Sequence, residues 1–259
     1  MYEAIKKLGQ NFLTDKTIAE RMVDSLSLHQ NDTVIEIGSG LGIVTEVLAE
    51  HMEGYNVKVY AVEIDGRFAA RLESMFVERE KLVVVEADIL QWLPKFSEEG
   101  SVKVLGSLPF YITSPIIHSI VKMNNLPEKV VLLVQKEVGE KIAGSAPDTT
   151  YMSAFVQTFF DVFYSETVPR QKFKPEPNVD GAVLTMTRKR KLPLNLILKY
   201  EGFLHRGFSS PRKMLNKPFK KEELEMAGIN PTIRPQNLSA DQWFAFFRIL
   251  HNIQDYNDE

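Results

Sequence analysis

Short apolar runs alternate with longer stretches of helical periodicity along most of the chain. The five clearest runs are rich in valine and isoleucine, and they occupy residues 34–37, 57–64, 82–85, 102–105 and 130–134. Amphipathic stretches that suit helices separate them. Continuous apolar strands with helices between them are typical of a buried parallel sheet covered on both faces. The pattern therefore predicts an α/β fold with a mostly parallel, Rossmann-like sheet.

Two weaker apolar runs, at 163–168 and 182–187, follow this region. The segment between them carries prolines and is too short for a helical crossover, so we expect the two strands to pair antiparallel at the sheet edge. Beyond about residue 191 the chain shows helical periodicity and no strand signal. We therefore predict two domains, a sheet domain at 1–190 and a small all-helical C-terminal domain at 191–259.

Composition excludes several classes of protein. Apolar residues make up 44% of the 259 residues, yet no apolar run approaches the roughly 18 residues that a membrane span needs. The first residues lack the charged-then-apolar layout of a secretory signal. The absence of cysteine removes disulfides, thiolate metal ligands and cysteine nucleophiles. We expect a cytoplasmic protein with no membrane segment and no metal.

Charge is unevenly distributed, although the formal net charge is only −3. Residues 165–221 hold 14 lysines and arginines against 4 acidic residues, a local charge of +10, which leaves −13 for the rest of the chain. In this basic segment the cations alternate with Phe173, Phe208 and Phe219. Such a mixture suits a phosphate backbone and exposed bases. An ordinary solvated face would have the same composition, so the segment alone leaves both interpretations open.

A glycine-rich loop follows the first predicted strand. In "EIGSGLG" the glycines are Gly38, Gly40 and Gly42, at the start of an amphipathic stretch. The dinucleotide fingerprint G-x-G-x-x-G would need its third glycine at position 43, which is Ile43, so the spacing argues against NAD. The E-x-G-x-G-x-G form is typical of methyltransferases that use S-adenosylmethionine. A purely structural turn is the alternative for the loop taken alone.

Two acidic residues follow the next two strands. Glu63 ends the second strand, about 20 residues beyond the loop, where a carboxylate can accept both hydroxyls of a ribose. Asp88 ends the third strand and can accept from an adenine amino group. Acidic residues also follow strands as helix caps, and this interpretation fits Asp65 better than Glu63. Together, the glycine loop and the two acids predict a nucleoside site.

The fourth strand ends in Ser107-Leu108-Pro109-Phe110, which resembles the (Asp/Asn/Ser)-x-Pro-(Tyr/Phe) motif of methyltransferases that modify amino groups. The amine of a base is a poor nucleophile because its lone pair is delocalised into the ring. A hydroxyl at Ser107 and a carbonyl at Leu108, held in place by Pro109, would accept both amine hydrogens and favour a pyramidal nitrogen. Phe110 would stack on the base. Catalysis of this kind is chiefly positioning.

The order of these motifs resembles one family nearly end to end, the small-subunit rRNA adenine N6,N6-dimethyltransferases. The segment "LGQNFL" resembles its N-terminal signature, and "EIGSGLG", "AVEID", "EAD" and "GSLPF" follow in the family's order. "KFKPEPNVDGAV", "FSSPRKMLNK" and "GINPTIRPQNLS" resemble three later segments. The resemblance implies a class I methyltransferase fold. It also implies S-adenosylmethionine-dependent dimethylation of adenine N6 near the 3′ end of small-subunit rRNA, in the biogenesis of that subunit.

The resemblance also implies roles for individual residues. Asn11 and Leu13 are expected to contact S-adenosylmethionine, and Phe173 is expected to face the target adenine from the side opposite Phe110. The expected cofactor-binding residues are Asn11, Leu13, Gly38, Gly40, Gly42, Glu63, Ile64, Asp88, Ile89 and Ser107. The expected contacts to the base and the RNA are Phe110, Phe173, Arg188, Lys189, Arg206, Arg212 and Lys213. The implied partner is rRNA in a pre-ribosomal particle, bound by a monomer.

Three positions depart from the family pattern, and two alternatives stay open. Ser107 and Phe110 stand where the family usually has Asn and Tyr, and Pro211 stands where its C-terminal segment usually has Arg. One alternative is a large-subunit rRNA adenine methyltransferase of the erythromycin-resistance type, which shares the sheet-domain motifs; the "PRKMLNK" segment favours the small-subunit type. The other is a non-catalytic assembly or transcription factor on the same fold.

Overall fold

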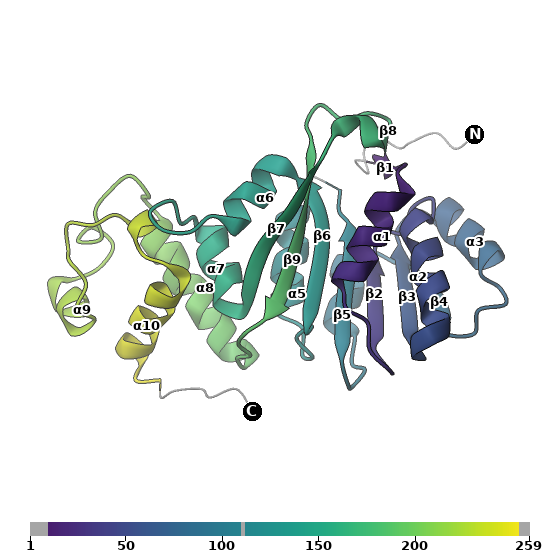
Figure 1. Cartoon of the computed structure of the whole chain (residues 1–259). Helices are drawn as coiled ribbons and strands as arrows, with labels where there is room; N and C mark the ends of the chain where they lie inside the picture. The colour runs from purple at the N-terminus through teal and green to yellow at the C-terminus, as the bar shows by residue number, and fades with distance from the viewer. Residues whose placement is uncertain (1–9, 110–111, 254–259) are drawn as a thin grey trace. The chain divides into compact units, whose positions relative to one another are not determined.

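The computed structural model describes residues 10–109 and 112–253, and a seven-stranded sheet organises them (Figure 1). The strand order is β4-β3-β2-β5-β6-β9-β7. The strands are β2 (Thr33–Ile37), β3 (Lys58–Glu63), β4 (Leu82–Glu86), β5 (Val102–Ser107), β6 (Lys129–Gln135), β7 (Phe160–Val168) and β9 (Gly181–Arg188). The first five pair in parallel, and β9 runs antiparallel to β6. The predicted mostly parallel sheet with an antiparallel edge is confirmed.

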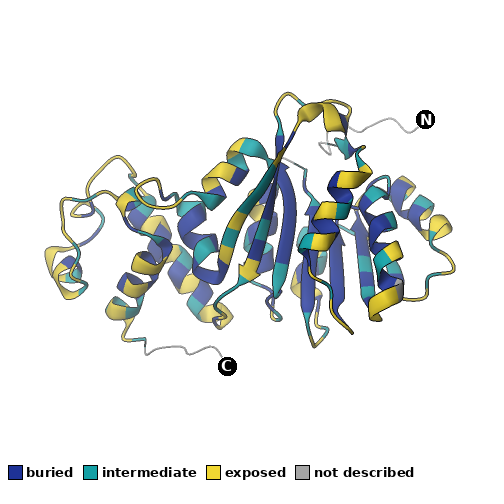
Figure 2. Ribbon diagram, viewed as in Figure 1, coloured by how far each residue is buried: buried dark blue, intermediate teal, exposed yellow. Residues whose placement is uncertain are grey.

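Helices connect the parallel strands, as the alternating pattern predicts. They are α2 (Ile43–Tyr55), α3 (Gly66–Met75), α4 (Ile89–Trp92) with a 3-10 turn at Leu93–Lys95, and α5 (Thr113–Val121). In addition, α1 (Lys16–Ser25) precedes β2 and α6 (Lys136–Ala143) follows β6. All five residues of β2 are buried, which fits its mostly apolar sequence and also buries Glu36. Figure 2 shows the same contrast, with dark blue central strands and helices whose outer faces are exposed.

A second, two-stranded sheet joins distant parts of the chain. Its strands are β1 (Phe12–Leu13) and β8 (Phe173–Lys174), which pair antiparallel, and a 3-10 turn at Arg170–Lys172 precedes β8. Lys172 binds Asp15 at the start of α1 with 2.6 Å between Nζ and Oδ2. The pairing therefore fixes the N-terminal strand against a segment about 160 positions later in the chain.

The remaining helices are α7 (Tyr151–Phe159), α8 (Leu194–Phe208), α9 (Lys221–Met226) and α10 (Ala240–His251), with a 3-10 turn at Pro235–Asn237. Their shared core is aromatic. Tyr200 of α8 packs against Phe159 of α7 and Phe247 of α10, with ring centroids 6.4 Å and 5.1 Å away. No helix in the described part of the chain is both long and apolar enough for a bilayer crossing.

Contacts divide the chain into two compact units. The first contains the residues up to Gly139 together with Phe163–Thr187, and the second contains Glu140–Val162 and the residues from Arg188 onward. The predicted domain boundary places the segment Glu140–Val162 in the sheet domain, whereas in the structure this segment groups with the C-terminal helices. The reason is the aromatic face of α7, which packs on α8 and α10. Amphipathic periodicity shows that such a face exists but does not show which partner it meets.

Candidate active site

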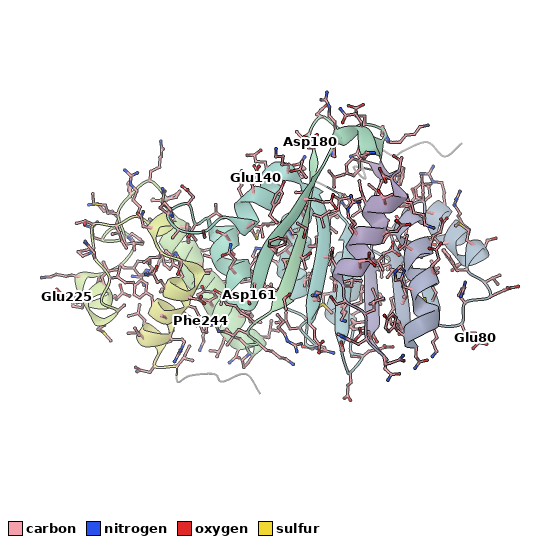
Figure 3. All side chains as sticks on the ribbon, viewed as in Figure 1. Glu80, Glu140, Asp161, Asp180, Glu225 and Phe244 are labelled. Atoms are coloured by element: carbon pink, nitrogen blue, oxygen red, sulfur yellow. The ribbon has the colours of Figure 1, made fainter. Side chains whose placement is uncertain are left out.

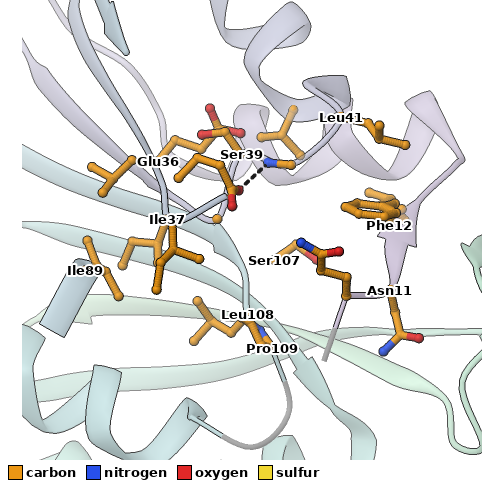
Figure 4. Close-up of a pocket in the computed structure, with 18 of the residues that line it drawn as sticks. Asn11, Phe12, Glu36, Ile37, Ser39, Leu41, Ile89, Ser107, Leu108 and Pro109 are labelled. Carbon is orange, nitrogen blue, oxygen red and sulfur yellow. Dashed lines mark hydrogen bonds between the residues drawn. The ribbon is translucent and has the colours of Figure 1, made fainter. Parts of the chain in front are cut away.

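A pocket lies at the carboxyl edge of the parallel sheet, where β2, β3, β4 and β5 end (Figure 4). This edge is where doubly wound sheets bind their ligands. The predicted cofactor residues that line it are Asn11, Leu13, Gly38, Gly40, Glu63, Ile64, Asp88, Ile89 and Ser107. Leu108, Pro109 and Phe173 line it as well. The pocket belongs entirely to the first unit.

The glycine loop between β2 and α2 combines two uses of glycine. Gly40 lines the pocket at a φ of +51°, and a Cβ there would lie 3.1 Å from the ring of Phe12. Gly42 is not part of the lining; it has a φ of +92° as the N-cap of α2, and a Cβ there would lie 2.8 Å from Leu72. Glycine at position 40 lets the loop pass close to Phe12 beside the pocket, and glycine at position 42 lets it pack against α3.

Glu63 is buried at the end of β3 and organises the loop. Its Oε2 accepts the Gly40 N–H at 2.8 Å, and its Oε1 accepts the Asp65 N–H at 2.9 Å. Burial raises the pKa of Glu63, and these backbone hydrogen bonds partly offset the shift. Each carboxylate oxygen has a further lone pair for a ligand hydroxyl. Ile64, 51% exposed, extends the apolar wall beside it.

The acids that follow β3 and β4 both cap helices. Asp65 is the N-cap of α3, as expected, and its carboxyl also accepts from Gln10 Nε2 at 3.0 Å. Asp88 is the N-cap of α4, where its Oδ1 accepts the Leu90 N–H at 2.9 Å. Asp88 lines the pocket at the same time, beside the buried Ile89. Its capping bond occupies one oxygen and leaves the other for a ligand.

Leu108 and Pro109, which directly follow β5, form backbone hydrogen bonds. The Leu108 N–H donates to the Leu133 carbonyl at 2.9 Å, and the Pro109 carbonyl accepts the Ile112 N–H at 3.2 Å. Among the described residues the Ser107 hydroxyl has no hydrogen-bond partner, and Ser107 faces the pocket. The predicted stacking residue Phe110 lies outside the described residues.

The small sheet of β1 and β8 closes another side of the pocket. Leu13 pairs with Phe173 in the register, and the Thr14 N–H donates to the Lys172 carbonyl at 2.8 Å. Phe173 is 4% exposed and lines the pocket. Phe12, which lies in "LGQNFL" but was not among the predicted site residues, lies edge-on to Phe68 with 5.1 Å between ring centroids. Predicted cofactor and target-base residues therefore share one two-stranded element.

A further pocket residue, Glu36, was not among the predicted site residues. It is 2% exposed, and its Oε2 accepts from Thr45 Oγ1 at 2.7 Å. Burial raises the pKa of Glu36 to about 7, against the hydroxyls of Thr45 and Ser39, which lower it. The available signal was its place as the first residue of "EIGSGLG", an acidic residue in the otherwise apolar run "VIEI".

The predicted RNA-binding cations differ in whether they pair with acidic residues and in how exposed they are. Lys189 Nζ lies 3.0 Å from Asp241 and 3.8 Å from Asp161, which is labelled in Figure 3. Arg206 forms a double hydrogen bond with Glu223 and packs over the ring of Phe219. Arg188 is half-buried at the end of β9, whereas Arg212 and Lys213 are exposed.

The residues present fit S-adenosylmethionine. Gly40 leaves room at a backbone turn that a Cβ would fill, Glu63 presents a buried carboxylate, and Ile64 and Ile89 supply apolar walls. The strand order and this pocket define a class I methyltransferase. Residues 1–252 match the family model described as ribosomal RNA adenine dimethylase. The chain belongs to the ribosomal RNA adenine dimethylase family, whose members use S-adenosylmethionine to methylate adenine in rRNA.

Individual proteins agree with the family match. The chain is 36% identical to the ribosomal RNA small subunit methyltransferase A of Persephonella marina over 247 residues, or 93% of this chain and 92% of that one. It is 33% identical to the protein of the same name from Sulfurihydrogenibium sp. over 252 residues, which cover 95% of this chain and 96% of that one. A dimethyladenosine transferase from Plasmodium falciparum shares the fold, with a TM-score of 0.76 at 20% identity over 93% of this chain and 98% of that one.

Proposed function

We propose that this enzyme dimethylates N6 of adenines near the 3′ end of small-subunit rRNA within a pre-ribosomal particle. The observation that carries the proposal is the Ser107 hydroxyl, which faces the pocket without a hydrogen-bond partner among the described residues, next to Leu108 and Pro109 with their backbone hydrogen bonds. The small-subunit relatives over nearly the whole chain support this choice of rRNA. We further propose that it acts in the cytoplasm as a monomer.

Ser107 and Leu108 would prepare the nucleophile. The Ser107 hydroxyl accepts one hydrogen of the target amine and the Leu108 carbonyl accepts the other, which withdraws the nitrogen lone pair from the ring. S-adenosylmethionine supplies an electrophilic methyl group when it is bound. The backbone hydrogen bonds of Leu108 and Pro109 restrict the backbone that carries both acceptors, so the contribution of the chain is orientation.

Phe173 would form a wall for the target base. Phe173 is nearly buried at the pocket, and it pairs with Leu13 across the two-stranded sheet of β1 and β8. A flat apolar ring favours stacking with a base that has left its helix. We propose Phe110 as the second stacking residue, on the resemblance alone.

The exposed pair Arg212 and Lys213 would contact the RNA backbone. Lys189 and Arg206, which were predicted to act with them, hold Asp241 and Glu223 instead and stabilise the second unit. Exposed cations keep their hydration and are available for phosphate. We therefore propose that RNA binding depends more on Arg212 and Lys213 than on the paired cations.

Single-turnover methylation of immature small subunits, scored by mass spectrometry for mono- and dimethyladenine, tests the role of Ser107. Ser107→Ala should leave cofactor affinity nearly unchanged and slow methyl transfer by about 30- to 1,000-fold, since one oriented acceptor contributes on the order of 2 to 4 kcal/mol to a transition state. Ser107→Asn, which supplies a longer acceptor of the family type, should maintain or raise the rate.

Three results would contradict the proposal. An active parent matched by Ser107→Ala would show that the hydroxyl does not act on the amine. Methylation of large-subunit rRNA in place of small subunits would favour the erythromycin-resistance type. A parent that methylates nothing, while Ser107→Asn is active, would indicate a binding factor derived from an enzyme.

A further inference from the structure

One buried carboxyl of the pocket has no part in the mechanism above. Glu36 lies in β2 and lines the pocket beside Ser39 (Figure 4). Its Oε2 accepts from Thr45 Oγ1 at 2.7 Å. Within the described residues no lysine, arginine or histidine pairs with it. A buried carboxylate without a cation is costly, so the pocket itself favours the protonated form.

The groups that surround Glu36 are neutral or negative on every packed element. Thr45 faces it from α2, and Ser39 faces it from the glycine loop. On β3 the register partner is Ala61 and the ionisable group is Glu63, whose charge opposes ionisation of Glu36. On β5 the register partner is Leu105. Burial raises the pKa of Glu36 to about 7, so a nearby positive charge would change its protonation under ordinary conditions.

We propose that Glu36 makes the pocket selective for the sulfonium cofactor over its demethylated product by releasing a proton when the positively charged ligand binds. The inference rests on S-adenosylmethionine being the methyl donor at this pocket. The product, S-adenosylhomocysteine, has the same groups except for the methyl group and the positive charge on sulfur. Glu36 gives its proton to solvent on binding and takes one back after the sulfur becomes neutral. The chain thereby holds the reactant more tightly than the product.

Linkage fixes the direction of the pH dependence. The bound cation lowers the pKa of Glu36, so between this lowered pKa and about 7 binding releases a proton and the affinity for S-adenosylmethionine rises with pH. Above this range Glu36 is already ionised, and the dependence levels off. The product, S-adenosylhomocysteine, lacks the positive charge on sulfur that lowers the pKa of Glu36. The ratio of the two affinities should therefore rise by about tenfold for each unit by which the cation lowers the pKa of Glu36.

Isothermal titration calorimetry of the full chain with each ligand, in two buffers of different ionisation enthalpy, counts the released protons. At pH values around 7, S-adenosylmethionine should release more protons than S-adenosylhomocysteine in the parent, and the difference should disappear in Glu36→Gln. Thr45→Val is the matched control. It removes a hydroxyl that stabilises the ionised carboxyl without changing a pocket-lining side chain, so the proton release should move to higher pH.

The outcomes separate this inference from the assignment of the pocket. Equal proton release by the two ligands in the parent, or an undiminished difference in Glu36→Gln, would overturn the inference while both ligands still bind. A parent that binds neither ligand would overturn the methyl-donor site as well. If Glu36→Gln fails to fold, an unchanged pH range in Thr45→Val would be decisive against the inference.

Discussion

At the scale of single residues, Glu63 combines two tasks in one carboxyl group. It accepts the N–H groups of Gly40 and Asp65, which fixes the glycine loop on β3, and it presents its remaining lone pairs to the pocket. A loop that is held in place before the ligand arrives loses less conformational entropy on binding. We therefore propose that Glu63 acts on the cofactor both directly and through the shape of the loop.

Glu63→Gln should weaken S-adenosylmethionine binding by about 10- to 150-fold, because a hydrogen bond to a charged group contributes about 1.5 to 3 kcal/mol and the amide has one acceptor fewer. Calorimetric titration measures the change in affinity. Glu86→Gln is the control, since Glu86 is the register partner of Glu63 on β4 but does not line the pocket. Equal affinity in both folded variants would refute the assignment of Glu63.

At the scale of elements, the packing of α8 on α10 depends on one small residue. Gly207 of α8 is buried, and a Cβ there would lie 2.5 Å from the indole ring of Trp243 on α10. Gly202 lies on the same helix, and a Cβ there would meet nothing within 4 Å. The two glycines separate the effect of close packing from the effect of helix propensity.

Gly207→Ala should lower the free energy of unfolding by about 1 to 3 kcal/mol, because the core of the second unit cannot hold the extra methyl group without moving Trp243. Gly202→Ala should raise it by about 0.5 to 1 kcal/mol, since alanine favours the helical backbone. Urea denaturation followed by tryptophan fluorescence measures both. A Gly207→Ala variant as stable as Gly202→Ala would show that α8 and α10 pack differently.

At the scale of the full chain, the acidic residues of the pocket and the exposed cations proposed to bind RNA lie in different segments. The pocket is lined in part by the acids Glu36, Glu63 and Asp88, whereas the exposed cations Arg212 and Lys213 belong to the basic segment. Paired and exposed cations have the same weight in a formal charge count. Their contributions to phosphate binding differ, because a cation held by a carboxylate must first give up that partner.

Arg212→Glu with Lys213→Glu should weaken binding to immature small subunits and leave cofactor affinity unchanged. The slope of log affinity against log salt should become shallower by about 0.7 to 0.9 for each phosphate that the variant no longer neutralises. Filter binding at several salt concentrations measures it. Lys95→Glu, at an exposed lysine outside the basic segment, is the charge control. A parent-like affinity and slope in the double variant would identify the basic segment as a solvated face.

Much of the fold follows from local patterns. The apolar runs predicted the seven strands of the main sheet. The signal was clearest for the five parallel strands, because buried parallel strands need apolar side chains on both faces. The glycine loop, Glu63 and Asp88 were found for a related reason, since the carboxyl ends of parallel strands meet at one edge. The grouping of α7 with the C-terminal helices and the pairing of Lys189 and Arg206 with acids were not predicted, because periodicity and charge counts name no partners.

Sequence alone was sufficient for the order of the motifs and for the family, and it named most of the pocket residues that we propose to bind the methyl donor, without Glu36. The folded chain was needed to show which of these residues lie together, and which of them are buried or paired. In it Phe173 lies beside Leu13, Gly42 lies behind the pocket, and Glu36 is buried without a cation. The physical reason is that side-chain type and spacing are local properties. Burial, hydrogen-bond partners and the pKa of a carboxyl depend on groups that come together only when the chain folds.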